Sequence, residues 1–134
     1  MILDTQYLGA LVDGNEAARV KAEELNETDV PTRIPTIVLW EAYTGIGNTT
    51  SEAVGGQLRE LYERLQRSRS TVELTPTVAR KAGSLNGKHL QYDTLSARDG
   101  ADSVIAAHGL LREEPVVSND ADFQDVEGLT LVTY

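Results

Sequence analysis

Four acidic residues lie where apolar runs of this 134-residue chain begin or end. They are Asp4, Glu41, Asp102 and Asp120. Carboxylates at the ends of buried elements can converge on one point, and converging carboxylates without a basic partner usually hold a hard cation. The residue types and their positions therefore indicate a site for Mg²⁺, with Mn²⁺ as the alternative ion.

Two of these carboxylates are predicted to share one edge of a sheet. Asp4 ends the first apolar segment, and Asp120 follows the apolar pair at 116–117. In open parallel α/β sheets, ligands bind beyond the carboxyl ends of the strands, so both side chains should face one crevice. Asp102 falls in the first turn of one predicted helix and Glu41 about one turn into another. Four carboxylates so close would raise one another's pKa, and a divalent cation removes that repulsion.

The elements that must position these acids are short apolar strands alternating with helices. Strands are predicted over 1–5, 72–74, 115–118 and 129–133, with an extended piece at 33–35. Helices are predicted over 7–12, 16–25 with Asn15 as cap, 37–46 with Thr36 as cap, 51–68, 76–85 with Thr75 as cap, and 100–111, and residues 86–95 fit a helix tail or a loop. The pattern predicts one α/β domain over residues 1–134, with a short, mostly parallel central sheet flanked by helices on both faces.

Composition excludes several kinds of protein. The chain has no cysteine, which removes disulfides, thiolate nucleophiles and zinc–thiolate sites. It has no run of about 18 apolar residues and no basic leader at its start, so we expect a cytoplasmic protein without a membrane span. The net charge of −9, with three lysines among twelve basic residues, fits a halophilic source or an ordinary acidic protein. It argues against non-specific binding of nucleic acid.

Competing catalytic motifs are absent from the sequence. There is no Gly-x-Ser-x-Gly elbow, phosphate-binding Walker loop or dinucleotide fingerprint. His89 and His108 are expected to be exposed or hydrogen-bonded side chains and not ligands. The carboxylates therefore have no strong rival as the chemical centre.

Four segments of the chain share their residue types and order with a known family: residues 1–5, 39–46, 102–110 and 117–123. Taken together and in order, they resemble the PIN domain and most closely its VapC-type toxins, and the resemblance spans essentially the whole chain. It implies a metal-dependent ribonuclease in which Asp4, Glu41, Asp102 and Asp120 are catalytic and bind the metal. Asp122 is then an outer-shell residue. Gln6 departs from the family pattern, which usually has Ser or Asn at this position. This departure puts in doubt a hydrogen bond near Asp4.

The same resemblance implies partners. Toxins of this type act on RNA, are held inactive by a cognate antitoxin that lies across the active-site groove, and usually form homodimers. Apolar and aromatic residues of two predicted helices offer a partner surface, and core packing is their alternative role. These residues are Trp40, Tyr43, Leu58, Leu61, Tyr62 and Leu65.

Arginines near the end of the helix at 51–68 are candidates for binding RNA. Arg67 and Arg69 follow Arg59 and Arg64 there, and Arg98 is a further candidate. A solvated helix face that pairs with Glu60 and Glu63 is the alternative.

Each acid also has a simpler interpretation. Asp4 and Asp102 can favour helix starts, Glu41 can be an exposed side chain, and Asp120 with Asp122 can form a turn. Asp99 is expected to cap the helix that begins near residue 100 and to lie at most in the outer shell.

Rival functions also remain at this stage. They are a stand-alone RNA-processing nuclease, a catalytically inactive PIN interaction module, and a phosphate-receiving signalling domain. The last would need paired acids after the first strand and a lysine late in the chain, yet no lysine follows Lys88.

Overall fold

The central sheet has five parallel strands in the order β3-β2-β1-β4-β5 in this computed structural model, which describes residues 1–92 and 100–134. The strands are β1 (Ile2–Leu3), β2 (Arg33–Pro35), β3 (Ser70–Val72), β4 (Val116–Val117) and β5 (Leu131–Val132). In the register, Leu3 lies opposite Val117, and Val117 lies opposite Val132. The predicted parallel α/β sheet is confirmed.

Helices connect the strands, and several of them begin at side-chain caps. They are α1 (Thr5–Val12), α2 (Glu16–Glu27), α3 (Thr36–Gly47), α4 (Glu52–Arg67), α5 (Pro76–Tyr92), α6 (Gly100–Arg112) and the 3-10 turn η1 (Ala121–Phe123). Side-chain oxygens of Asn15, Ser51 and Thr75 accept hydrogen bonds from backbone N–H groups in the first turns of α2, α4 and α5. Such caps satisfy donors that the helix itself leaves unpaired.

Two predicted boundaries were wrong by a few residues. The strand expected at 72–74 is β3 at Ser70–Val72, because Val72 is the buried residue that pairs with Pro35 and the chain turns at Glu73. Thr36 does not cap α3 but is its first residue, and its hydroxyl accepts a hydrogen bond from the N–H of Leu74 at 3.3 Å. The chain therefore leaves β2 and enters α3 without a loop.

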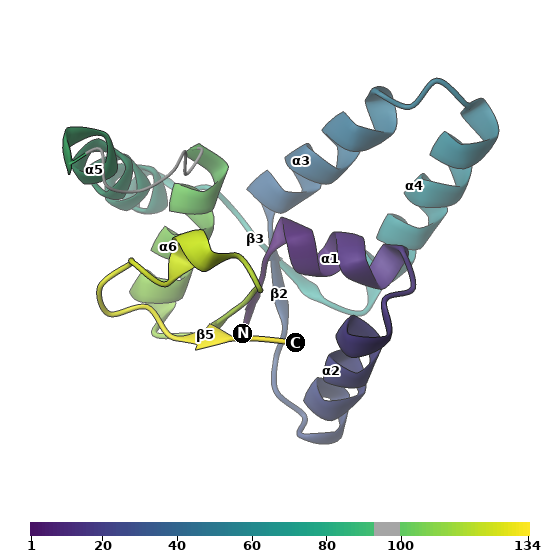
Figure 1. Cartoon of the computed structure of the whole chain (residues 1–134), viewed down its shortest axis with the longest axis horizontal. Helices are drawn as coiled ribbons and strands as arrows, with labels where there is room; N and C mark the ends of the chain where they lie inside the picture. The colour runs from purple at the N-terminus through teal and green to yellow at the C-terminus, as the bar shows by residue number, and fades with distance from the viewer. Residues whose placement is uncertain (93–99) are drawn as a thin grey trace.

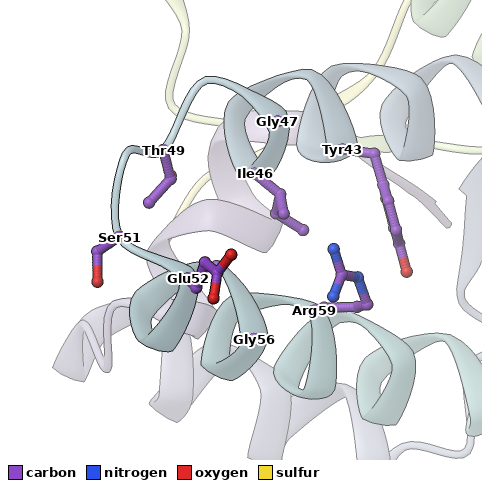
Figure 2. Close-up of a pocket in the computed structure, with 9 residues that line it drawn as sticks. Tyr43, Ile46, Gly47, Thr49, Ser51, Glu52, Gly56 and Arg59 are labelled. Atoms are coloured by element: carbon purple, nitrogen blue, oxygen red, sulfur yellow. The ribbon is translucent and has the colours of Figure 1, made fainter.

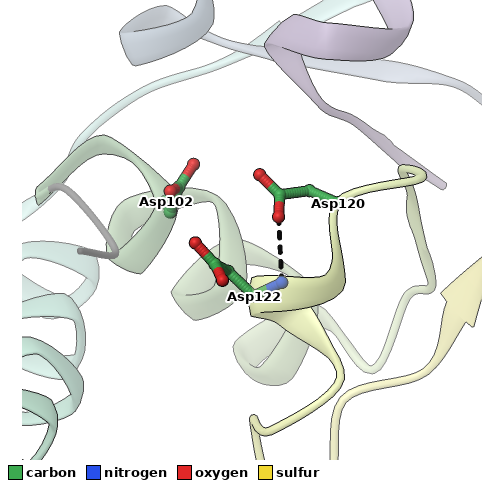
Figure 3. A group of neighbouring side chains, drawn as sticks. All are labelled: Asp102, Asp120 and Asp122. Atoms are coloured by element: carbon green, nitrogen blue, oxygen red, sulfur yellow. Dashed lines mark hydrogen bonds between the residues drawn. The ribbon is translucent and has the colours of Figure 1, made fainter. Parts of the chain in front are cut away.

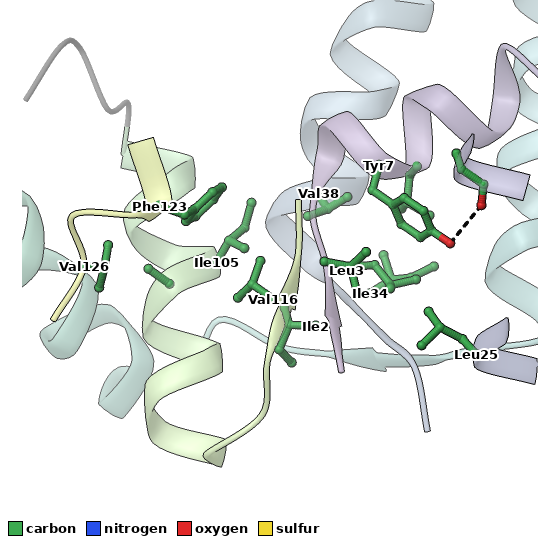
Figure 4. Close-up of a cluster of buried hydrophobic side chains, with 14 residues drawn as sticks. Ile2, Leu3, Tyr7, Leu25, Ile34, Val38, Ile105, Val116, Phe123 and Val126 are labelled. Atoms are coloured by element: carbon green, nitrogen blue, oxygen red, sulfur yellow. Dashed lines mark hydrogen bonds between the residues drawn. The ribbon is translucent and has the colours of Figure 1, made fainter. Parts of the chain in front are cut away.

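Helices cover both faces of the sheet, and the core continues across it (Figure 1). Ile105 and Phe123 pack on one side of β1 and β4, while Tyr7 and Leu25 pack on the other (Figure 4). The residues of β1 and β4 are fully buried, as expected for strands of a parallel sheet covered on both faces. None of the helices in the described ranges has both the length and the apolar character to cross a membrane.

The buried helix α6 approaches β4 closely at Gly109. A Cβ atom at this position would lie 2.7 Å from Leu129 Cδ1, 3.0 Å from Val116 Cγ2 and 3.1 Å from the carbonyl oxygen of Glu114. The carbonyl oxygen of Glu114 belongs to the backbone, so it cannot move aside as the end of a flexible side chain can. The absence of a side chain lets α6 lie against the strand whose end carries Asp120.

The two histidines depart from their predicted setting. His108 and His89 are 1% and 5% exposed, and within the described part of the chain neither ring nitrogen of either residue has a hydrogen-bond partner. The expectation of exposed side chains was therefore wrong, and the described residues supply neither imidazole with a hydrogen bond. Burial lowers the pKa of His108 to about 4, and the positive charge of Arg112 contributes in the same direction. The imidazole is neutral at pH 7.

Gly109→Ala should destabilise the protein by about 1–3 kcal/mol, because the added methyl group overpacks the interface between α6 and β4. Gly83→Ala in α5 is the matched control, since among the described residues outside its own helix turn no heavy atom lies within 4 Å of its added Cβ. That control should gain about 0.5–1 kcal/mol from helix propensity. Urea unfolding measures both values, and equal stability of the two variants would contradict the close approach.

His108→Leu should reduce the sensitivity of the fold to acid. In the unfolded chain a histidine takes up a proton below its usual pKa of 6.5, whereas His108 stays neutral in the fold down to about pH 4. Stability is therefore lost as the pH falls through this window, by up to about 3 kcal/mol. The free energy of unfolding, measured at pH 7.5 and pH 5, should fall less in the variant than in the wild type. Equal losses would show that His108 is not the acid-sensitive group.

Candidate metal centre

Three aspartates from two parts of the chain bring their carboxylates together. One oxygen of each of Asp102, Asp120 and Asp122 lies within 4.8 Å of the others. Asp102 comes from the first turn of α6, and the other two come from the segment that follows β4. The three half-buried side chains point toward a common space (Figure 3).

Local hydrogen bonds set the direction of the two aspartates after β4. Asp120 precedes η1, and its Oδ1 accepts a hydrogen bond of 2.9 Å from the N–H of Asp122. The N–H of Asp120 donates to Oγ of Ser118 at 3.0 Å. Because η1 folds the chain back within one turn, the carboxylates of Asp120 and Asp122 lie on the same side (Figure 3).

Asp4 is the most deeply buried acid of the site, with 3% of its surface exposed. It follows β1, and its Oδ2 accepts a hydrogen bond of 2.7 Å from the hydroxyl of Ser118. Burial raises the pKa of Asp4 and the negative charge of Asp120 raises it further, while the Ser118 hydroxyl and the N–H groups of Thr5 and Gln6 lower it. Ser118 thus connects the segment of Asp4 with the segment of Asp120. Its hydroxyl donates to the Asp4 carboxylate and accepts from the N–H of Asp120.

Glu41 is held next to this pair from the second turn of α3. The hydroxyl of Thr5, the residue directly after Asp4, donates a hydrogen bond to its Oε2. Glu41 is half-buried, and α1 and α3 contact each other. The side chain of Gln6 is exposed, and Asp4 accepts a side-chain hydrogen bond from Ser118.

The predicted acids therefore lie in one region, but not all of their carboxylates belong to the close group. Asp102 and Asp120 have carboxylate oxygens within 4.8 Å of each other, Asp4 is connected to the Asp120 segment through Ser118, and Thr5 connects Glu41 to the segment of Asp4. Asp122, predicted as an outer-shell residue, belongs to the close group. Asp99 and Arg98 lie outside the described residues.

Sequence reasoning missed two hydroxyl groups. Thr5 follows the first predicted ligand, and Ser118 lies two residues before Asp120. A hydroxyl beside a buried carboxylate is a recognisable signal for a hydrogen-bonded ligand, since metal ligands are usually held by a second set of polar groups. The spacing could have identified both residues.

The donor set fits a hard divalent cation. Every predicted ligand offers carboxylate oxygens, which Mg²⁺ and Mn²⁺ prefer over nitrogen or sulfur. The charge of Asp120 already raises the pKa of Asp4, so the acids repel one another across the site. A cation among them would relieve this repulsion.

The arginines of α4 and Arg69, which follows it, take several positions. Arg67 is 76% exposed and lies 3.8 Å from Glu63, and Arg64 lies 3.4 Å from Glu60. Arg69 is partly buried, and its Nη1 donates to the carbonyl oxygen of Leu65 and to the hydroxyl of Ser68. The pairs on α4 fit the alternative of a solvated helix face, and the role of Arg67 and Arg69 in RNA binding stays a prediction.

A groove of about 520 Å³ separates α3 from α4. Tyr43 and Arg59 face each other across it from the two helices (Figure 2). Tyr62 and Leu65 pack against the core, whereas Trp40 is 62% exposed. Of the residues predicted as a partner surface, Trp40 and Tyr43 are thus available at the surface.

Several solved structures share this fold. VapBC2 from Rickettsia felis, bound to a DNA fragment from its promoter, matches with a TM-score of 0.83 and 17% identity over 98% of this chain and 96% of the other. DNA-bound VapBC from Salmonella typhimurium matches with a TM-score of 0.80 and 19% identity over 98% and 96%. VapBC-5 from Mycobacterium tuberculosis, a toxin–antitoxin system, matches with a TM-score of 0.67 and 20% identity over 98% and 94%.

At the level of sequence, the comparison with curated proteins gave no significant match. The family model of the PIN domain matches residues 1–129, which is nearly the whole chain. This match agrees with the parallel sheet, the order of the elements and the acidic group at its carboxyl edge. The chain belongs to the PIN domain family.

Proposed function

We propose that this protein is a metal-dependent endoribonuclease that uses Mg²⁺, or Mn²⁺ in its place. The observation that carries the proposal is the group of carboxylates at the carboxyl edge of a PIN-domain sheet. PIN domains are generally nucleases, and their chemistry needs acids in this arrangement. We assign ion binding and catalysis to Asp4, Glu41, Asp102 and Asp120, with Asp122 contributing an oxygen to the same group.

The bound cation would supply positive charge to the phosphoryl group and lower the pKa of a coordinated water. The protein's own residues fix the geometry. Ser118 holds Asp4 in place, and Thr5 holds Glu41, which we assign to orienting the attacking water. Water then forms the new bond to phosphorus as the bond to the 3′ oxygen breaks. A proton passes to that oxygen, and the product carries a 5′ phosphate.

We further propose that the protein is the toxin of a VapBC-type system, acts in the cytoplasm and pairs with a cognate antitoxin, with a homodimer as its own assembly. The support is the fold shared with toxin–antitoxin complexes from three bacteria. A stand-alone RNA-processing nuclease would use the same centre without an antitoxin. The converging acids argue against an inactive interaction module, because such a module would not need them.

Asp102→Asn and Asp120→Asn should each lower RNA cleavage by about 100-fold or more, because each removes a charged ligand from the centre. A fluorescent RNA substrate with Mg²⁺ or Mn²⁺ measures the rate, and EDTA should abolish cleavage until the cation is restored. Asp125→Asn is the matched control, since Asp125 is exposed in the same loop and lies outside the acidic group. Wild-type rates in Asp102→Asn and Asp120→Asn would refute the assignment.

Expression of the wild-type protein in a bacterial host should arrest growth, and Asp120→Asn should not, if the nuclease acts as a toxin. Co-expression of the protein encoded by the adjacent gene should restore growth and yield a stable complex on size exclusion. Folding of Asp120→Asn is checked by circular dichroism. Normal growth with active wild-type enzyme would favour the stand-alone nuclease over the toxin.

A further inference from the structure

We propose that Asn119 and Tyr134 are positioning residues for the metal centre, tying the loop that carries Asp120 to the segment after β5 and, through it, to the core. The inference rests on the proposed metal-dependent function, and it concerns two residues that contribute no carboxylate to the centre. Five contacts carry it: a pair of hydrogen bonds, a ring contact, and two links of the neighbouring Ser118.

A pair of hydrogen bonds between Asn119 and Tyr134 continues the pairing of β4 with β5 beyond the ends of both strands. Asn119 Nδ2 donates to the carbonyl oxygen of Tyr134 at 2.8 Å, and the N–H of Tyr134 donates to Asn119 Oδ1 at 2.9 Å. An amide side chain offers one donor and one acceptor side by side, as a peptide group does. Since Val117 lies opposite Val132, Asn119 and Tyr134 are each two residues beyond this pair. The side chain thus extends the contact of β4 with β5 past the ends of both strands.

Tyr134 anchors this extension on the core. Its ring lies 4.9 Å from the ring of Tyr7, centroid to centroid, at an interplanar angle of 57°. Tyr7 is 1% exposed, and its hydroxyl donates to the carbonyl oxygen of Ala18.

The loop before Asp120 is therefore held from two directions. On one side the hydroxyl of Ser118 binds Asp4, and the N–H of Ser118 donates to the carbonyl oxygen of Val132 at 3.0 Å. On the other side Asn119 binds Tyr134. Asp120 follows directly, and its carboxylate must keep a fixed place near Asp102. Without the two hydrogen bonds of Asn119, this segment would lose one of its two restraints in the described part of the chain, and those of Ser118 would remain.

Asn119 is exposed, so its two hydrogen bonds are separable from core packing. A residue that only stabilised the fold would change the unfolding temperature and leave the affinity of the folded protein for a cation unchanged. A positioning residue would change the affinity for the cation and the turnover number. Groups that orient metal ligands typically affect metal affinity by about 10–100-fold.

The test measures Mn²⁺ binding directly, by the loss of the electron paramagnetic resonance signal of free Mn²⁺, on the full chain. Asn119→Ala should weaken Mn²⁺ binding by about 10-fold and lower kcat for RNA cleavage with KM unchanged. Tyr134→Ala should act in the same direction, and Tyr134→Phe, which keeps the ring and both backbone hydrogen bonds, should restore most of the affinity.

Thr28→Ala is the matched control. Thr28 is also exposed, and its hydroxyl also makes two contacts to backbone, with the carbonyl oxygens of Glu24 and Leu25 at the end of α2. It should match Asn119→Ala in thermal unfolding and keep wild-type Mn²⁺ affinity. An equal loss of Mn²⁺ affinity in both variants would overturn the proposal, because the effect would then follow general stability.

Asp120→Asn separates this inference from the function on which it rests. If Asp120→Asn weakens Mn²⁺ binding and Asn119→Ala does not, the positioning role is overturned and the metal centre stands. If Asp120→Asn leaves Mn²⁺ binding unchanged, the metal centre itself is overturned, and the positioning role with it.

Discussion

Repulsion between carboxylates at a buried edge of the sheet is the constraint on which the rest of this structure depends. Asp4 is almost completely buried, and Asp120 is close enough to raise its pKa further. Burying a charge beside a like charge is unfavourable unless hydrogen bonds or a cation compensate. The hydroxyls of Ser118 and Thr5 provide part of this compensation at Asp4 and Glu41. The remaining repulsion would be relieved by a cation at the proposed centre.

The parallel topology explains why acids from distant parts of the chain meet. Leu3 lies opposite Val117 in the sheet, so the next residues along each strand, Asp4 and Ser118, are also neighbours. Asp102 arrives from α6, which lies tightly on β4 because Gly109 has no side chain to hold it away. A shift of one residue between β1 and β4 would turn Asp4 away from Ser118. The register of two very short strands thus controls the chemistry at their ends.

The sequence predicted the parts of this arrangement that follow from apolar runs. Asp4 and Asp120 lie at the ends of buried strands and Asp102 in the first turn of a helix, as their flanking residues indicated. The place of Asp122 depends on a single 3-10 turn, which leaves no periodic signal in the sequence. The burial of His108 depends on how α6 packs against the rest of the fold. The sequence shows a polar residue on an apolar helix, but it does not show which residues will surround that side chain. Long-range contacts of this kind come from the fold and not from local propensity.

Two buried groups respond to acid in opposite ways, and their balance bears on the role of a cation. His108 has a lowered pKa, so it favours the unfolded chain as the pH falls. Asp4 has a raised pKa, so its protonation favours the fold as the pH falls, and its charge opposes folding near pH 7. Near neutral pH the uncharged His108 therefore does not lower the stability of the fold, whereas the buried charge of Asp4 does. A cation that binds only the folded protein would offset this effect where the acid is charged. The stability of the fold and the occupancy of its proposed centre are linked through the same side chain.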